Sequence, residues 1–251
     1  MIHNINSPRS LRKREQKREL IIQTALELIL EAGLAGFTMH KLAEKMDYAV
    51  GALYRYFKSK DTLLAAMQRQ ILSEFSQCFI QTDLLCKEQY QDFSQKELAL
   101  QRIWLAVEIY LNLKKQAPSK FYLLHEMIVS PQEILSLQEG LLVMKEALPL
   151  LRHLQELLTF ATETKAFREG NANQRSLLLW SSVQGLLPLE KLGRFVPGYP
   201  FESLQTALLE TLFSAWGASE SSLKKVKIEN QKFIKSIGFL SQFSTLSEGA
   251  S

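Results

Sequence analysis

The sequence predicts an all-α protein, and three observations support this. Apolar residues recur almost everywhere at the three- and four-residue spacing of one helix face. Short breaks such as "EAGLAGF", "FREGNAN" and "GRFVPGYP" separate these stretches. No stretch alternates apolar and polar residues convincingly enough to indicate a strand. We therefore expect a chain of helices without a sheet.

The first sixty residues predict three short helices and the start of a fourth. The first helix carries one apolar stripe, made of Ile21, Ala25, Leu28, Ile29 and Ala32, and Gly33 suits its C-terminal cap. Thr38 can cap a helix over residues 39–46. After the turn "DYA" we expect a helix over residues 50–57, and Ser59 can cap one running from residue 60 toward residue 80. Two short helices separated by a three-residue turn are typical of a helix-turn-helix motif.

Longer helices follow beyond residue 90. We expect them over residues 95–115, 119–129, 132–167 with a bend at Pro149, 174–192 and 201–216. Residues 219–251 are Ser-rich with a weaker amphipathic pattern, which predicts a loosely docked extra helix or a largely disordered tail.

Charge is unevenly distributed along the chain. The net charge is +4, but residues 1–60 hold eleven Lys and Arg against six acids, so the rest of the chain is close to neutral. A basic head on a near-neutral body indicates a nucleic-acid-binding module joined to something else. A solvated charge run near a terminus is the alternative.

Several function classes find no support. No apolar run is long enough to span a membrane, no secretory signal is evident, and two cysteines, Cys78 and Cys86, indicate a reducing compartment, so we expect a cytoplasmic protein. Four scattered histidines offer no metal site, and no phosphate loop or nucleophile motif occurs. We expect neither an enzyme nor a cofactor. Lysines after residue 219 would suit a membrane-surface helix, but we expect no membrane partner.

Residues 21–67, "IIQTALELILEAGLAGFTMHKLAEKMDYAVGALYRYFKSKDTLLAAM", resemble the DNA-binding domain of TetR-family transcriptional regulators. That domain has an alanine-bearing first helix, then Thr-x-x-x-(Ile/Leu)-Ala and Gly-x-Leu-Tyr-x-(His/Tyr)-Phe-x-x-Lys. The matched positions are Ala25, Gly33, Thr38, Leu42, Ala43, Gly51, Leu53, Tyr54, Tyr56, Phe57 and Lys60. The resemblance implies a basic arm over residues 1–14, a helix-turn-helix domain over 15–67, a ligand-binding and dimerisation domain over 68–218, and a tail over 219–251.

The residue pattern divides the second helix of the motif into two faces. Leu53 and Phe57 fall on the core side, while Tyr54 and Arg55 project toward phosphates and base edges. The resemblance implies that Thr38, Tyr54 and Lys60 contact phosphate. The whole expected DNA-binding set is Thr38, Lys41, Tyr48, Ala49, Val50, Tyr54, Arg55, Lys58 and Lys60. The alternative is that the tyrosines only pack in the core.

Two positions depart from the family pattern, which usually has Gly-Val-Ser-Lys where this chain has Asp47-Tyr48-Ala49-Val50. Asp47 can still adopt the left-handed turn conformation. Ala49 cannot cap the following helix, at a cost of about 1 kcal/mol. We expect base reading to depend on apolar contacts of Ala49 or Val50 and on Tyr48 and Arg55.

The segment "RSLRKREQKR" is an arm or a helix extension that reaches the minor groove or flanking phosphates. In the body, the family implies a dimer and a ligand pocket. The expected dimer residues are Leu177, Trp180, Ser181, Gln184, Leu208, Leu212 and Phe213, and the expected ligand residues are Trp104, Glu108, Tyr110, Phe121, Tyr122 and His125. The alternative is that both sets complete the monomer's own core.

These patterns together predict a homodimeric one-component transcriptional regulator, by family expectation a repressor. It would bind a palindromic operator in double-stranded DNA and release it on binding a small, hydrophobic effector. The alternative is a helical dimeric ligand-binding or protein-interaction module with weak or no specific DNA binding, which the changes at Ala49 and Val50 motivate.

Overall fold

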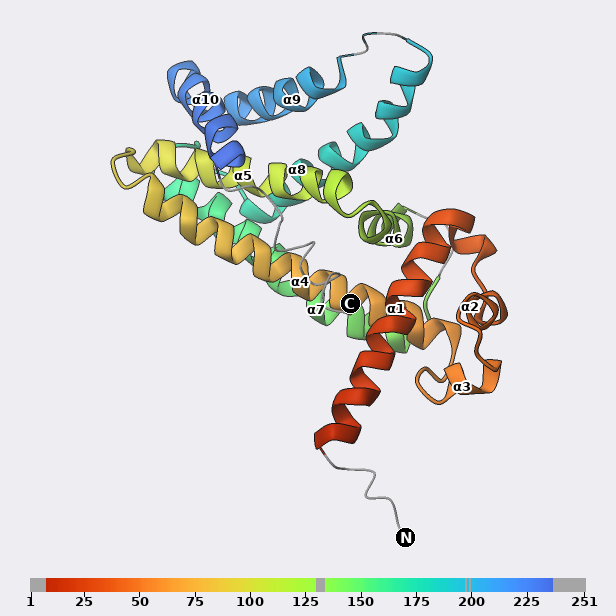
Figure 1. Ribbon diagram of the computed structural model, residues 1–251. Helices are drawn as coiled ribbons and strands as arrows, with labels where there is room; N and C mark the ends of the chain where they lie inside the picture. Colours follow the sequence, from red (N-terminus) through yellow and green to blue (C-terminus); the bar gives the residue numbers. More distant parts are fainter. Residues whose placement is uncertain (1–7, 130–133, 197, 199, 237–251) are drawn as a thin grey trace. The chain divides into compact units, whose positions relative to one another are not determined.

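Residues 8–129, 134–196, 198 and 200–236, which the computed structural model describes, form helices and connecting turns and no strand (Figure 1). In order they are α1 Pro8–Gly36, α2 Met39–Lys45, α3 Val50–Tyr54, α4 Lys60–Gln89, α5 Gln95–Gln116, α6 Pro118–Val129, α7 Leu137–Glu163, α8 Ala172–Leu186, the 3-10 helix η1 Leu187–Arg194, α9 Phe201–Trp216 and α10 Glu220–Ser236. The predicted all-α class is confirmed. None of these helices combines the length and apolar character needed to cross a membrane.

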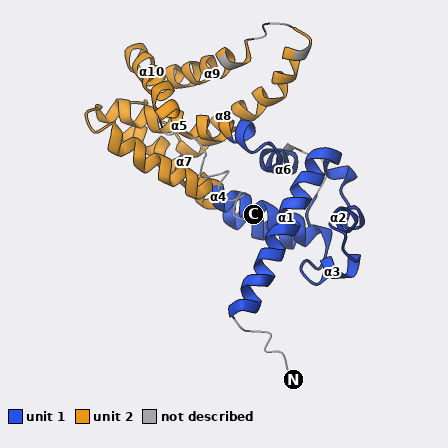
Figure 2. Cartoon of the chain, in the orientation of Figure 1, with its two compact units in different colours: residues 1–74, 113–147 blue, residues 75–112, 148–251 orange. Residues whose placement is uncertain are grey.

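The chain divides into two compact units (Figure 2). Unit 1 comprises residues 1–74 and 113–147, and unit 2 comprises residues 75–112 and 148–251. Helices α4, α5 and α7 each pass from one unit into the other. Unit 1 thus contains α6 in addition to the helix-turn-helix, whereas the expected functional division at residue 67 stays a prediction.

Unit 1 is built around the apolar stripe of α1. Ile21, Ala25 and Ile29 are fully buried, and α1 packs against both α2 and α6. The first half of α7 runs parallel to the start of α4, because contacts advance in the same direction along both helices. Ser136 Oγ donates to Asp61 at 2.6 Å, Thr62 Oγ1 donates to Glu139 at 3.2 Å, and Arg69 pairs with Glu146 at 3.5 Å.

Helix α1 begins at Pro8, so the basic residues expected in an arm over residues 1–14 are helical from that point on. Its regular conformation breaks at Gly33, whose φ of 70° and ψ of 168° lie where glycine alone is readily accommodated. The cap expected at Gly33 is therefore the place where the helix is interrupted. Ala32, expected on the buried stripe, is exposed.

Other helix ends also differ from the expected ones. Helix α3 stops at Tyr54 and closes in a tight turn in which the Tyr56 and Phe57 amides donate to the Leu53 carbonyl, so the expected helix over residues 50–57 is shorter. Helix α4 continues to Gln89. The expected helix over residues 174–192 changes to η1 next to Pro188, which has no N–H to donate. Pro149 lies inside α7, whose expected first residues, 132 and 133, fall outside the described residues.

In unit 2 a cluster of aromatic rings joins the end of α7 to α9. The Phe167 ring lies 5.4 Å from that of Phe213 and 5.3 Å from that of Trp216, and Trp104 contacts Phe213 edge-on at 5.9 Å. These edge-to-face arrangements are the favoured ones for aromatic pairs. The cluster therefore fixes α9 against α5 and the turn after α7.

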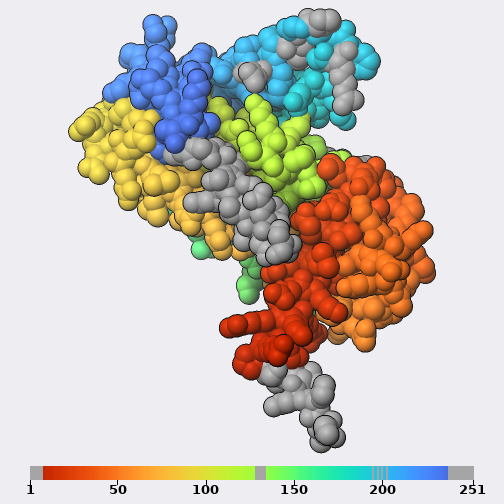
Figure 3. Space-filling model, viewed as in Figure 1, coloured from red at the N-terminus to blue at the C-terminus, as the bar shows by residue number. Residues whose placement is uncertain are grey.

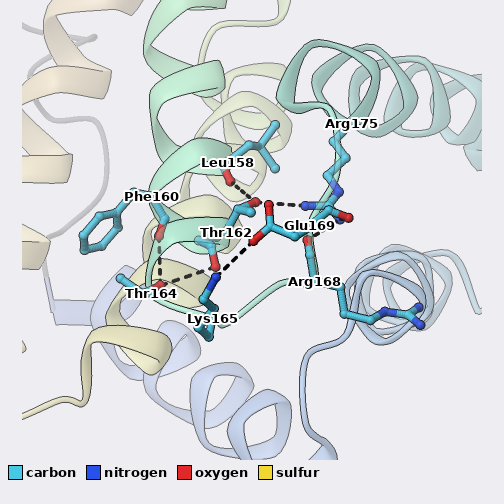
Figure 4. A network of polar contacts seen from close by, with 9 residues as sticks. Leu158, Phe160, Thr162, Thr164, Lys165, Arg168, Glu169 and Arg175 are labelled. Carbon is cyan, nitrogen blue, oxygen red and sulfur yellow. Dashed lines mark hydrogen bonds and ion pairs between the residues drawn. The ribbon is translucent and has the colours of Figure 1, made fainter.

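Arg175, at the start of α8, is buried beside this cluster and fastens the turn between α7 and α8 (Figure 4). Its guanidinium donates to Thr162 Oγ1 at 3.0 Å and to the Arg168 carbonyl at 2.8 Å. It also lies over the Phe167 and Trp216 rings. A Cβ added at Gly170 would overlap the guanidinium, so this close approach requires glycine.

Helix α10 is firmly packed, which corrects the expectation of a loosely docked or disordered tail over residues 220–236. Val226 and Phe233 are fully buried, and the Tyr90 hydroxyl donates to the Glu229 carbonyl at 2.9 Å. Because this apolar face is covered by the protein, it is not available to a membrane surface. Residues 237–251 of the expected tail lie outside the described residues.

Candidate nucleic-acid interface

A helix–turn–helix is formed by α2, a short turn and α3. The Thr38 hydroxyl accepts the Lys41 amide at 3.2 Å and caps α2, as expected. Asp47 has a φ of 53°, so it adopts the predicted left-handed conformation in the turn. The Tyr48 amide donates to the Ala43 carbonyl at 2.8 Å, which holds the turn closed. Ala49 provides no side-chain cap for α3, as predicted.

Helix α3 is anchored by one face and exposed on the other. Leu53 and Phe57 are 0% and 1% exposed, so they hold the segment against the core as predicted. Tyr54 is 45% exposed and Arg55 is also exposed. The interpretation of Tyr54 as a core residue is therefore wrong, and its hydroxyl and the Arg55 guanidinium face solvent. Tyr56 is half-buried.

The other expected DNA-binding residues surround this face. Thr38, Lys41, Ala49 and Lys58 are exposed, while Tyr48 and Val50 are half-buried. The Lys41 ammonium donates to the Gly36 carbonyl at 3.0 Å but remains exposed. With Thr38 already accepting an amide, its hydroxyl hydrogen remains available to donate. Contacts of this set with DNA stay a prediction.

Lys60 binds backbone carbonyl groups at the end of α1. Its ammonium donates to the Phe37 carbonyl at 2.7 Å and to the Leu34 carbonyl at 3.3 Å, and it lies 5.4 Å from the centre of the Phe37 ring. Burial lowers the pKa of this lysine. The half-buried side chain binds the end of α1 within unit 1, and its contact with phosphate stays a prediction.

Arg18 has a role that the sequence did not reveal. Its guanidinium lies 4.5 Å from the centre of the Phe57 ring and donates to the Tyr56 carbonyl at 3.2 Å. The side chain thus fixes α1 to the turn that follows α3. Its spacing of three and seven residues before Ile21 and Ala25, on the buried stripe, could have indicated this inward orientation.

The expected ligand residues are distributed over both units. In unit 1, Phe121 is buried and stacks on His125 with ring centres 5.7 Å apart. The Tyr122 hydroxyl bonds to the Leu34 backbone and lies beside Gly33, so Tyr122 belongs to the contact between α6 and α1. Burial, together with the nearby Glu126 carboxylate, raises the pKa of this tyrosine.

The remaining ligand candidates lie in unit 2. Trp104 is 2% exposed and packs in the aromatic cluster, which makes it a core residue rather than an accessible lining residue. Glu108 is half-buried. Tyr110 accepts a hydrogen bond from Gln184 at 2.8 Å, and burial raises its pKa to about 12. Among the described residues, no three His, Cys, Asp or Glu side chains lie together as metal ligands would.

Two of the expected dimer residues are committed to the core of a single chain. Phe213 is fully buried in the aromatic cluster, and Gln184 is 8% exposed because its amide binds the Tyr110 hydroxyl. Neither offers area to a second copy, which corrects that expectation. Leu177 is 63% exposed and Ser181 is exposed, while Trp180, Leu208 and Leu212 are half-buried, so these five remain candidates.

Comparison with known proteins agrees with this geometry. Residues 21–67 match the family of bacterial regulatory proteins called the tetR family. The tetracycline repressor protein class C of Escherichia coli is 42% identical over 57 residues, which are 23% of this chain and 26% of the repressor. The chain thus matches about a quarter of the length of that curated relative.

Solved structures share the fold along most of the chain. A tetR-family regulatory protein from Rhodococcus RHA1 superposes with a TM-score of 0.59 at 13% identity, covering 81% of this chain and 99% of that one. The regulator FadR from Bacillus subtilis, solved in complex with stearoyl-CoA, superposes with a TM-score of 0.58 at 20% identity. The match covers 77% of this chain and 96% of that one.

The fold and the interface define a helix-turn-helix DNA-binding domain followed by a helical body. Residues 21–67 match the tetR family of bacterial regulatory proteins, and the overall fold is shared with a solved protein of that family. The resemblance predicted from the sequence is therefore confirmed. The family consists of regulatory proteins, which agrees with the expectation that the chain is not an enzyme.

Proposed function

We propose that this protein is a homodimeric transcriptional repressor that binds a palindromic operator and releases it when a small apolar effector binds. The observation that carries the proposal is the orientation of α3. Leu53 and Phe57 are buried and fix it, while Tyr54 and Arg55 are exposed side by side. A hydroxyl and a guanidinium presented on a short rigid helix are suited to phosphate and base-edge contacts.

Dimer formation is the second part of the proposal. A palindrome is read by two such helices about one helical turn, or ~34 Å, apart, so a second copy is needed. The exposed residues of α8, above all Leu177 and Ser181, offer an apolar face with a small residue that permits close approach. We assign this face, with the half-buried Trp180, Leu208 and Leu212, to the partner copy.

The effector forms the third part. The interior of unit 2 is filled by apolar and aromatic side chains such as Leu158, Phe167 and Phe213, and the fold relative FadR was solved with stearoyl-CoA. We therefore propose a hydrophobic effector, with a long-chain acyl-CoA as the first compound to test. Stearoyl-CoA should release the protein from DNA at concentrations where CoA alone does not, because the acyl chain supplies the apolar surface to be buried.

Selection of bound fragments from random duplex DNA tests the DNA-binding function. We expect a palindromic sequence to be enriched, and we expect Tyr54→Ala and Arg55→Ala each to weaken binding to it by about tenfold or more. Arg152→Ala, an exposed arginine on α7, is the matched control and should bind as the unaltered protein does. If no sequence is enriched, the chain is instead a helical ligand-binding or interaction module, as the uncapped five-residue α3 would then suggest.

A further inference from the structure

The first ten residues of α1, Pro8–Lys17, form a basic helical extension beyond the apolar core of unit 1. Its five cations are all exposed, and they are Arg9, Arg12, Lys13, Arg14 and Lys17. Within the part of the chain that the structure describes, none of these five makes an ion pair. In Figure 3 the N-terminal part of α1, coloured red, projects from the remainder of unit 1. The first ten residues of α1 therefore present five positively charged side chains that have no ion-pair partner among the described residues.

The extension is held at a fixed angle to the DNA-binding helix. Arg18, the next residue, rests on the Phe57 ring and donates to the Tyr56 carbonyl, directly after the exposed Tyr54 and Arg55. Because α1 is regular from Pro8 as far as Gly33, this anchor sets the direction of the whole extension. The basic extension is therefore linked, through Arg18 at its base, to the turn that follows α3 within unit 1.

Helical form decides between the two kinds of DNA contact that the sequence left open. A helix with its side chains is about 10–12 Å across, whereas the minor groove of B-DNA is about 6 Å wide. The helix itself cannot enter that groove, which favours contacts of its cations with the phosphates along the groove edges. Residues 1–7, "MIHNINS", contain no lysine or arginine that could enter the groove in its place.

We propose that the basic extension of α1 binds the phosphates of duplex DNA that flanks each operator half-site, without reading base sequence. The inference rests on the proposed DNA-binding function and adds a second contact region to it. At 1.5 Å per residue the ten residues span about 15 Å, which corresponds to about four base pairs of flanking duplex. The extension would thus lengthen the site that the protein covers and increase its salt dependence.

The triple variant Arg9→Gln/Arg12→Gln/Lys13→Gln tests this proposal in the full-length chain. Glutamine forms helices well, so the extension should keep its structure without its charge. The matched control removes three exposed lysines from α10, as Lys224→Gln/Lys232→Gln/Lys235→Gln. The probe is the duplex recovered by selection, used alone and with eight added base pairs at each end, with affinity measured by fluorescence anisotropy.

We expect added flanks to tighten binding of the unaltered protein by about tenfold at low salt, and we expect the triple variant to lose this gain. The slope of log affinity against log salt on the long duplex should fall by up to about 5 in magnitude, since the dimer loses six cations and each phosphate contact contributes about 0.9. The control variant should keep both properties. Flanks made only of A·T or only of G·C pairs should bind equally.

Three results would overturn the inference: no gain from added flanks, an unchanged salt slope in the triple variant, or a preference for A·T flanks, which would indicate minor-groove reading. In each case the unaltered protein would still prefer the selected sequence. If it instead binds the selected and an arbitrary duplex of equal length equally well, the proposed operator-binding function itself fails. The two failures are therefore distinguishable.

Discussion

The Lys60 ammonium lies 2.7 Å from the carbonyl oxygen of Phe37 and donates to it, with a second bond to Leu34. Carbonyl groups at a helix C-terminus lack partners within the helix and carry the negative end of its dipole. A cation from the first residue of α4 satisfies them and ties α1 to α4. Lys60 therefore contributes to the shape of the DNA-binding domain.

Replacing Lys60 with methionine should lower the free energy of unfolding by about 1–2 kcal/mol. The figure reflects loss of two charge-assisted hydrogen bonds that are only partly shielded from water. Lys58→Met removes an exposed lysine two residues away and should change stability by less than about 0.5 kcal/mol. Urea unfolding followed by circular dichroism gives both values. Equal stability of the two variants would show that the bonds to the end of α1 are dispensable.

Gly33→Ala should destabilise the protein by about 1–3 kcal/mol, because a φ of 70° with a ψ of 168° is a conformation that residues with a Cβ rarely adopt. Gly140→Ala, inside α7 with no atom within 4 Å of an added Cβ, provides the control. There alanine favours the helix and should stabilise by up to about 1 kcal/mol. Thermal unfolding of the two variants should shift in opposite directions, and a Gly33→Ala protein as stable as the original would contradict the strained geometry.

Asp83→Asn should remove part of the protein's sensitivity to acid. Burial alone would raise the pKa of Asp83, but His153, whose Nε2 lies 3.3 Å away, and two hydrogen bonds from Arg102, at 2.6 and 2.8 Å, hold it well below its usual range. The depressed pKa means that the folded state favours the carboxylate. Its stabilisation is present above the unfolded pKa of about 3.9 and is lost as pH falls below it.

At pH 7 the asparagine variant should be about 3–5 kcal/mol less stable, since Arg102 then remains buried without its partner. Its stability should fall less than that of the original as pH falls below about 4, so the two stability profiles converge in acid. Asp92→Asn, at an exposed position, should follow the original protein at every pH. Parallel pH profiles for Asp83→Asn and the original would refute the assignment of the acid-sensitive group.

Leu177→Arg should weaken self-association by at least about tenfold, because a cation would be placed in the apolar face assigned to the partner copy. Leu137→Arg is the matched control, since Leu137 is 80% exposed on α7, outside that face. Sedimentation velocity at several concentrations measures the effect. Should the control dissociate the dimer while Leu177→Arg does not, the interface would lie on α7 instead.

Features of the structure that depend on neighbouring residues can be predicted from the sequence, whereas contacts between residues far apart in the chain cannot. The division of residues 53–57 into buried Leu53 and Phe57 and exposed Tyr54 is predicted by helical periodicity alone, and it is confirmed. Partners of Lys60 lie 23 and 26 residues earlier in the chain, so no local pattern reveals them. The sequence left the N-terminal segment open between an arm and a helix extension, because its residues, although good helix formers, have no core to face.

The dimer face illustrates a further limit. An apolar stripe shows that a helix buries one side, but it does not show whether the covering surface belongs to the same chain. Phe213 and Leu212 are neighbours of similar character, yet one lies in the aromatic cluster and the other is half-buried. For Gln184 the deciding contact is a hydroxyl 74 residues away, on Tyr110.

The Arg175 guanidinium fills the space that a side chain at position 170 would need, so a larger residue at 170 requires a change at 175. Among descendants of the same ancestral gene, any residue larger than glycine at 170 should accompany a shorter one than arginine at 175. Paired substitution at these two sites would show that the packing of α7, α8 and α9 around residue 175 has been kept under selection.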